Sequence, residues 1–324
     1  MRKITGLFLT ILFASACGDS GNPIPDNLEF RQEMRDFVIA ISQYAKTRNP
    51  DFVIIPQNGQ EIVSLDGTPT GSPAMDYLTA IDGTGREDLF YGYDADNRET
   101  KADDRAYLTG FLDIFEQHNV EVLTTDYCHT PEKMDDSYTL NQAKGYISFA
   151  APERDLNVIP DYPSSPYNEH QGAVNHLGEA RNFLYIINPG DFVSRTAFIT
   201  ALKQTNYDAI IMDYFFDGEE TYTTEEIQQL KIKANGGKRL VISYMSIGEA
   251  EDYRYYWQAE WKNSPPSWLD KENPQWKGNY KVRYWESGWQ AVIMGDANAY
   301  LDKVLASGFD GVYLDIIDAF EYFE

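Results

Sequence analysis

The sequence has few of the residues that most enzymes use for metal binding or nucleophilic catalysis. It contains two cysteines and four histidines in 324 residues. The histidines lack metal-ligand spacing and lie at a helix end or in loops, so we expect no metal and no cofactor; they are His118, His129, His170 and His176. No G-x-S-x-G elbow is present, and no Gly-rich phosphate loop follows any strand-like segment. These absences argue against serine hydrolases and against dinucleotide-binding or P-loop enzymes.

Basic residues are also scarce. Lys and Arg number 27 against 51 Asp and Glu, which gives a formal net charge of −24. Such a charge argues against nucleic-acid partners and against binding to anionic lipid through a basic patch. It suits a cationic ligand, and equally a solvated acidic surface.

Long hydrophobic runs are confined to the N-terminus. Arg2 and Lys3 precede the short apolar segment 4–14, a pattern typical of a signal peptide and too short for a membrane span. The following Ala14-Ser-Ala-Cys17-Gly resembles a bacterial lipobox, which predicts that residues 1–17 are a signal peptide, that Cys17 is lipidated and that residues 18–28 are a tether. The alternative is ordinary Ala-x-Ala cleavage and secretion. Either way we expect an exported protein. If Cys17 is lipidated, the lipid anchor is the expected membrane contact and Cys128 is left without a partner.

Beyond residue 28, helix-period segments alternate with short apolar runs, which predicts a parallel α/β sheet. Residues 29–324 are expected to form a single (β/α)8 TIM-like barrel of two blocks, 29–151 and 179–324, joined by an irregular linker, 152–178. Nine strand candidates compete for eight places, and an open doubly wound sheet is the alternative. The candidates are 52–56, 77–82, 120–126, 146–150, 183–187, 208–213, 239–246, 280–285 and 310–317, with 146–150 and 280–285 the weakest.

Helices are expected over 30–46, 104–118 and 287–306. A further helix should begin at Thr223, because Glu226 three residues later completes a capping box.

Acids and amides recur at the predicted carboxyl ends of these strands. In a parallel sheet these ends meet on one rim, where barrel enzymes keep their active sites. Any one of them could instead cap a helix or sit in a solvated loop. Together, without a His or Cys cluster, they favour the two-carboxylate chemistry of glycoside hydrolysis. The residues are Asn58, Asp82, Asp126, Asp213, Glu249, Asp315 and Asp318.

Several motifs resemble the endo-α-1,4-polygalactosaminidase-like proteins, glycoside hydrolase family 114. From residue 182 onward the resemblance rests on "YDAIIMDYFFDG", "SIGEAEDYR" and "GFDGVYLDIIDAFEYF". Elements that follow these motifs in most relatives occur here at the front, as "DFVIIPQNGQE", "AIDGTGRED" and "VEVLTTDYC". The chain is therefore similar to a circular permutation of the family, and two tandem half-domains are the alternative. A permuted barrel requires the segments near Phe30 and Glu324 to be neighbours.

The resemblance implies hydrolysis of an α-1,4-linked galactosamine polymer in a (β/α)8 barrel, with Asp315 and Glu87 as the catalytic acids. Asp315 is the expected nucleophile and Glu87 the acid/base, with Asp318 and Asp82 in reserve. Arg254 could instead belong to an ion pair that only holds its loop. The expected substrate contacts are Asp213, Tyr244, Glu249, Arg254, Asn58, Asp82, Asp126, Tyr127, Asp318 and Trp285.

The expected partner is a polysaccharide, and unacetylated galactosamine is a cation that an acidic rim would attract. Two other functions remain open at this stage. One is a non-catalytic polysaccharide-binding lipoprotein on a glycosidase scaffold, and the other is hydrolysis of an unrelated glycan.

Overall fold

The structure is a computed structural model that describes residues 24–25, 27–218 and 220–324. The expected signal peptide, Cys17 and most of the expected tether lie outside the described residues. Over the described part of the chain, no helix combines the length and apolar character needed to cross a membrane.

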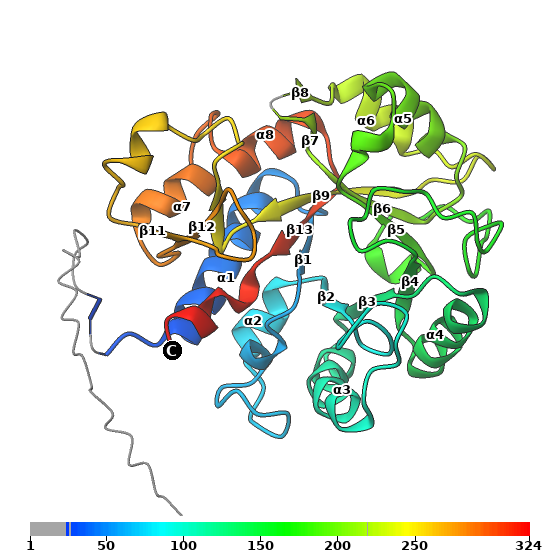
Figure 1. The fold of residues 1–324 in the computed structure, drawn as a ribbon, viewed down its shortest axis with the longest axis horizontal. Coiled ribbons are helices and arrows are strands. Elements are labelled where there is room, and N and C mark those ends of the chain that lie inside the picture. The colour runs from blue at the N-terminus through cyan, green and yellow to red at the C-terminus, as the bar shows by residue number, and fades with distance from the viewer. Residues whose placement is uncertain (1–23, 26, 219) are drawn as a thin grey trace, which may run out of the picture.

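Two parallel sheets form the centre of the molecule (Figure 1). The five-stranded sheet has the order β1-β13-β9-β6-β5, and the three-stranded sheet the order β2-β3-β4. Their strands are β1 (Val53–Pro56), β13 (Gly311–Asp315), β9 (Leu240–Ser246), β6 (Ala209–Asp213), β5 (Phe183–Ile186), β2 (Gly83–Glu87), β3 (Glu121–Tyr127) and β4 (Ile147–Ala151).

The edges of the two sheets lie side by side at both junctions. At the first junction the amide of Asn58 donates a 2.8 Å hydrogen bond to the carbonyl of Gly85, just beyond β1. At the second, the rings of Phe149 in β4 and Phe183 in β5 lie 5.8 Å apart. The parallel α/β architecture expected from the sequence is confirmed.

Helices cover the outer side of the strands, and their apolar faces pack on them (Figure 1). They are α1 (Phe30–Arg48), α2 (Met75–Ala80), α3 (Ala102–Gln117), α4 (Pro131–Lys144), α5 (Arg195–Lys203), α6 (Thr224–Leu230), α7 (Ser287–Ile293) and α8 (Tyr300–Ser307). In α1 the buried Met34, Phe37, Val38 and Ile41 repeat at helical spacing, which explains why this segment is a helix. The capping box of Thr223 and Glu226 opens α6, as predicted.

Three sequence expectations are wrong. Residues 77–82 are not a strand, because Tyr77 to Ala80 belong to α2 and the strand is the next segment, β2. The strand predicted at 280–285 belongs to a separate antiparallel sheet. The helix predicted over 287–306 is two helices, and the chain turns between them where Gly295 has a φ of +139°.

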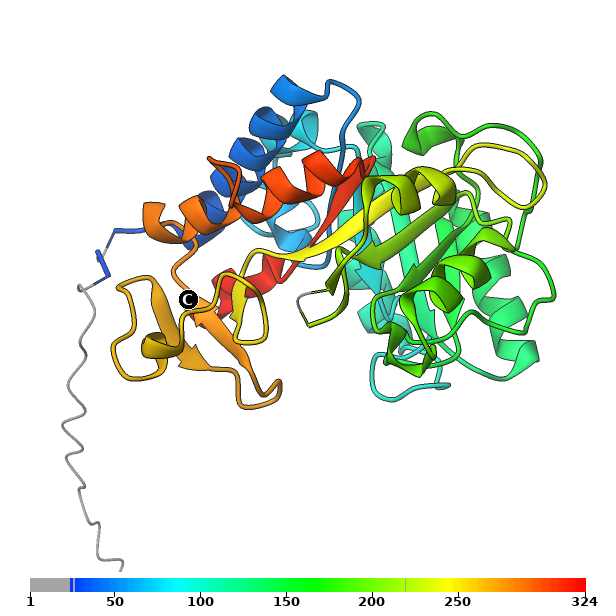
Figure 2. The same ribbon diagram turned by 90° about the horizontal axis from the view of Figure 1, so that it is seen from above.

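The separate sheet is an insertion after β9, and we call it the small sheet. It consists of β10 (Glu249–Glu251), β12 (Asn279–Val282) and β11 (Leu269–Glu272), in that spatial order. Only two residues separate β9 from β10, so the small sheet stands at the carboxyl end of β9 (Figure 2). A two-stranded ribbon, β7 (Phe215–Asp217) with β8 (Glu220–Thr221), follows β6 in the same way.

The two ends of the described fold are neighbours, as the sequence predicts. Arg31 and Glu324 form an ion pair at 2.8 Å. The rings of Phe30 and Phe323 lie 5.5 Å apart, and Trp285 packs against both.

Candidate active site

Asp315 is the last residue of β13, so its carboxylate lies at the carboxyl rim of the sheet. Its Oδ2 accepts a 2.6 Å hydrogen bond from the hydroxyl of Tyr244 in β9, and its Oδ1 accepts one of 2.8 Å from the amide of Ile316. Ile316 has a φ of +61°, an unfavourable conformation for a β-branched residue. Such strain is typical of functional sites, and here it lies directly beside the carboxylate.

Glu87 occupies the equivalent place at the end of β2. Its Oε2 accepts a 2.9 Å hydrogen bond from Asn58, and its Oε1 accepts a short one from the hydroxyl of Tyr127. The side-chain oxygen of Asn58 in turn accepts from the amide of Glu87 at 3.2 Å. Both carboxylate oxygens of Glu87 are therefore held in fixed directions by side chains from β3 and from the end of β1.

The two carboxylates influence each other electrostatically. Burial and, after it, the nearby negative charge of Glu87 together raise the pKa of Asp315 to about 7, against the opposing hydrogen bond from Tyr244. Asp315 is thus about half protonated near neutral pH. A carboxyl group whose pKa is raised toward 7 by burial and by a second carboxylate is a recognised feature of acid–base sites.

Buried tyrosines form the floor under this pair. Tyr185 in β5 donates a 3.0 Å hydrogen bond to Gln57, and its ring lies 5.1 Å from that of Tyr313. A Cβ placed on Gly85 would lie 1.9 Å from the hydroxyl of Tyr313, so only glycine fits there. Sequence reasoning missed these residues. The signal was available for Tyr313, because it stands two residues before Asp315 and therefore shares its face of the strand.

Arg254 is the centre of a buried ionic cluster beside the pair. Its guanidinium binds both carboxylate oxygens of Asp213, at 3.0 and 2.7 Å, and contacts Glu251 at 2.6 Å. Asp213 ends β6, while Glu251 belongs to the small sheet. The cluster thus fixes the small sheet to the rim, which agrees with the ion-pair alternative for Arg254.

Three predicted substrate contacts are turned away from the rim opening. Asp82 precedes β2, at the opposite end of the strand, where it pairs with Lys46 at 3.0 Å. Asp126 is fully buried and accepts hydrogen bonds from two backbone amides and from Ser137 and Asn141 of α4. Glu249 is fully buried as well, and Lys281 binds it at 2.6 Å. Internal partners hold each of the three carboxylates, which favours a structural role over a contact with substrate.

Asp318 and Trp285 complete the predicted set. Asp318 lies in the short 3-10 helix η5 (Ile317–Tyr322) and is half-buried; burial raises its pKa, while Lys281 and Arg86 lower it. It therefore lies within electrostatic reach of Glu87. Trp285 packs with the rings at the two chain ends.

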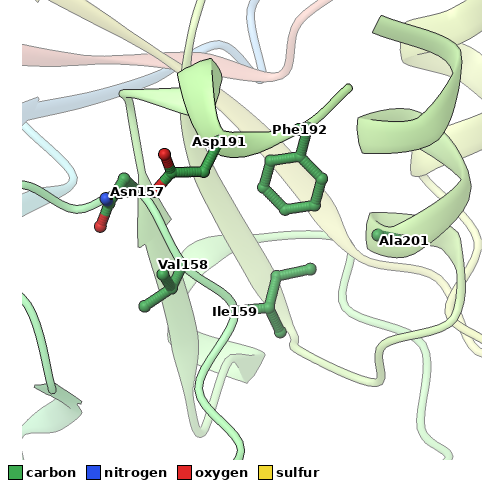
Figure 3. Close-up of a pocket in the computed structure, with 6 residues that line it drawn as sticks. All are labelled: Asn157, Val158, Ile159, Asp191, Phe192 and Ala201. Atoms are coloured by element: carbon green, nitrogen blue, oxygen red, sulfur yellow. Dashed lines mark hydrogen bonds between the residues drawn. The ribbon is translucent and has the colours of Figure 1, made fainter. Parts of the chain in front are cut away.

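A hollow of about 350 Å³ opens between the loops that follow β4 and β5 (Figure 3). It is lined by Asn157, Val158, Ile159, Asp191, Phe192 and Ala201. A 2.7 Å hydrogen bond from Asn157 to Asp191 ties the two loops together. Neither Asp315 nor Glu87 lines this hollow, and its walls are mainly apolar.

Comparison with known families identifies the part of the chain that carries Asp315. Residues 185–324 match the model of glycoside-hydrolase family GH114. The match begins in β5 and ends at the last residue, so it includes Asp213, Tyr244, Arg254 and Asp315 but not Glu87. It supports a glycoside hydrolase.

Similar proteins match over a comparable length. An uncharacterised protein of Methanocaldococcus jannaschii, MJ1477, is 48% identical over 130 residues, which are 40% of this chain and 35% of that protein. An uncharacterised protein of Thermotoga maritima is 39% identical over 143 residues, 44% of this chain and 40% of its own. One from Deinococcus radiodurans is 40% identical over 123 residues, 38% of this chain and 37% of its own. The matched segment thus spans well under half the length of these relatives.

Proposed function

We propose that the protein is a glycoside hydrolase that cleaves an α-1,4-linked galactosamine-type polysaccharide with Asp315 and Glu87. The observation that carries this proposal is the arrangement of two carboxylates at the same rim, each held by a tyrosine hydroxyl and coupled through their charges. The GH114 match of the segment containing Asp315 supports the same chemistry.

We further propose that the eight parallel strands close into a (β/α)8 barrel in a circularly permuted order, so that residues 29–324 form one domain. The adjacent sheet edges at β1–β2 and β4–β5 support closure. The pairing of β1 with β13 and the contact between Arg31 and Glu324 support permutation, because a permuted ring needs neighbouring ends. The GH114 match to residues 185–324, which lie in the second block alone, agrees with it.

In the proposed reaction, a carboxylate oxygen of Asp315 attacks the anomeric carbon. The glycosidic C–O bond breaks as Glu87 gives its proton to the leaving oxygen. Glu87 then takes a proton from water, whose oxygen attacks the same carbon and releases Asp315. Tyr244 and the amide of Ile316 orient Asp315, while Tyr127 and Asn58 orient Glu87.

The raised pKa of Asp315 bears on this assignment, because a nucleophile must be ionised. In the free protein the pKa of about 7 leaves Asp315 only partly ionised near neutral pH. A cationic amino sugar bound at the rim would lower the pKa of Asp315 and favour its carboxylate form. The assignment of Asp315 as nucleophile therefore fits a galactosamine polymer better than a neutral one.

The site would act outside the cytoplasm. We propose that the chain is exported as a lipoprotein anchored through Cys17, with its polysaccharide substrate as partner.

The test is incubation of the protein from residue 18 onward with partly deacetylated α-1,4-galactosaminogalactan. Wild type should release oligosaccharides, and Asp315→Asn and Glu87→Gln should each lower the rate at least about 10³-fold, as removal of a catalytic group does. Asp161→Asn, an exposed acid in the 152–178 segment, is the matched control and should keep full activity.

Addition of azide to Asp315→Ala and to Glu87→Ala distinguishes the nucleophile from the acid/base. Azide should restore cleavage with inverted configuration in the variant that lacks the nucleophile, which we expect to be Asp315→Ala. Binding of the polymer without release by wild type would contradict hydrolysis and favour a binding protein.

A further inference from the structure

Two exposed aromatic side chains stand on the small sheet, outside the rim. Tyr253 is 48% exposed and Trp276 is 63% exposed. Tyr253 follows β10, and Trp276 lies in the turn between β11 and β12. A single exposed apolar side chain is ordinary, but exposed aromatic side chains that group on one surface can mark a binding site.

Tyr253 is held as a rigid platform. Its hydroxyl donates a 2.6 Å hydrogen bond to Glu251 and lies 3.4 Å from the side-chain oxygen of Asn279. The guanidinium of Arg254 lies 5.2 Å from the ring centroid. The ring is therefore fixed at its polar end and supported by a buried cation, while nearly half of it is open to solvent. A pre-oriented aromatic ring loses little conformational entropy when it binds a ligand.

The turn that carries Trp276 is rigid as well. The amide of Trp276 donates to Asn273 at 3.2 Å, and its carbonyl accepts from Asn279 at 3.0 Å. Gly278 adopts a φ of +92°, and its amide donates to Glu272 at 2.9 Å. These bonds fix the backbone under an indole that faces solvent.

The two aromatics belong to one surface, because the turn packs against Tyr253. The carbonyl of Gly278 accepts a 2.8 Å hydrogen bond from the amide of Asp252, next to Tyr253. A Cβ placed on Gly278 would lie only 3.6 Å from Tyr253 Cδ1. Trp276 stands two residues before this contact.

A series of contacts joins the small sheet to the rim. The hydroxyl of Tyr253 binds Glu251, Glu251 binds Arg254, and Arg254 binds Asp213 at the rim. Only two residues separate the small sheet from Ser246, which pairs with Asp315, so Tyr253 and Trp276 stand on the side of the fold where the rim lies. Flat, half-exposed aromatic rings beside hydrogen-bonding groups suit the apolar faces and hydroxyl edges of pyranose rings.

We propose that Tyr253 and Trp276 form an auxiliary binding surface for the polysaccharide chain, beyond the sugar units that are cleaved. This proposal rests on the proposed function for the identity of the glycan, but it concerns binding rather than cleavage. It predicts that a long chain binds through contacts that a short fragment cannot make.

The test measures binding in the Asp315→Asn background, so that the polymer is not consumed. Affinity electrophoresis in gels that contain partly deacetylated α-1,4-galactosaminogalactan, or its fully acetylated form, gives a dissociation constant for each variant. We expect Trp276→Ala and Tyr253→Ala each to weaken binding at least about threefold, the size of an exposed aromatic contact. Tyr107→Ala on α3 is the matched control, because Tyr107 is 47% exposed yet lies on the outer face of the fold, and it should bind unchanged.

Equal binding by Trp276→Ala and the control would overturn the proposal, as would no binding of the polymer by the parent Asp315→Asn protein. A change of oligomeric state in Trp276→Ala, seen by size exclusion without loss of glycan binding, would also overturn it in favour of contact between copies. The two proposals can fail separately. If wild type releases oligosaccharides but Trp276→Ala binds the polymer normally, the hydrolase proposal stands and the binding surface is refuted. If Trp276→Ala weakens binding but wild type releases nothing, the binding surface stands and the hydrolase proposal is refuted.

Discussion

Replacing Asp315 by Asn should make the folded protein more stable at alkaline pH while it removes activity. The pKa of Asp315 is about 7 in the folded protein, because the carboxyl group is buried beside Glu87. In an unfolded chain an Asp carboxyl has a pKa of about 3.9. Folding therefore disfavours the ionised form, and ionisation of Asp315 favours unfolding.

The direction follows from these two values. The raised folded-state pKa gives stability that is fully present below about pH 3.9, declines as the unfolded chain ionises, and is lost once the pH has risen through 7. A difference of about three pKa units corresponds to about 4 kcal/mol in the free energy of unfolding above pH 7, and to about 1.5 kcal/mol at pH 5. The partial exposure of Asp315 makes these figures upper limits. An asparagine side chain has nearly the same shape as aspartate and does not ionise, so its burial does not lower the free energy of unfolding as the pH rises.

Urea unfolding at pH 4, 5, 6, 7 and 8 measures this effect in wild type, Asp315→Asn and Asp161→Asn. The advantage of Asp315→Asn should grow with pH and level off above pH 7, whereas Asp161→Asn, an exposed position, should follow wild type. A difference between Asp315→Asn and wild type that stays constant from pH 4 to pH 8 would refute the reasoning, since it would mean that Asp315 titrates alike in both states.

Three further outcomes are expected. Arg254→Met leaves two buried carboxylates unpaired and should lower the free energy of unfolding by about 3–5 kcal/mol. Arg31→Met removes the exposed terminal ion pair and should lower it by less than about 1 kcal/mol. Similar urea midpoints for the two variants would contradict this difference. Tyr244→Phe removes a hydrogen bond that lowers the pKa of Asp315, so the pKa of Asp315 should rise. The acidic limb of the pH–rate profile should then move to higher pH. An unchanged profile would contradict this role of Tyr244. Gly85→Ala places a methyl group against the buried hydroxyl of Tyr313 and should lower the free energy of unfolding in urea by about 1–3 kcal/mol. A urea midpoint equal to that of wild type would contradict the close fit.

The sequence predicted the strands with continuous β-branched or aliphatic runs, because burial on both faces leaves that signature. It failed at residues 77–82, where a short apolar run fits a helix and a strand equally well. It also left α4 unassigned, because that helix is mostly polar outside its buried face.

For the site, the sequence placed acids at strand ends but could not give their direction. Asp126 is the next-to-last residue of β3, and Tyr127 after it points the opposite way. Two adjacent residues therefore have different roles: Asp126 is a buried structural acid, whereas Tyr127 contacts Glu87. Likewise Glu249 sits where an active-site acid could stand, and only the insertion of the small sheet shows that Lys281 neutralises it.

The pairing of β1 with β13 has a consequence for biosynthesis. These strands lie side by side in parallel register, from Val53 with Gly311 to Pro56 with Leu314. A chain emerging from the ribosome therefore exposes an unpaired edge of β1 until β13 has been made. Glu87 is synthesised well before Asp315, so the two acids meet only after β13 has left the ribosome. A chain truncated before β13 would hold neither a complete central sheet nor a pair of carboxylates at its rim.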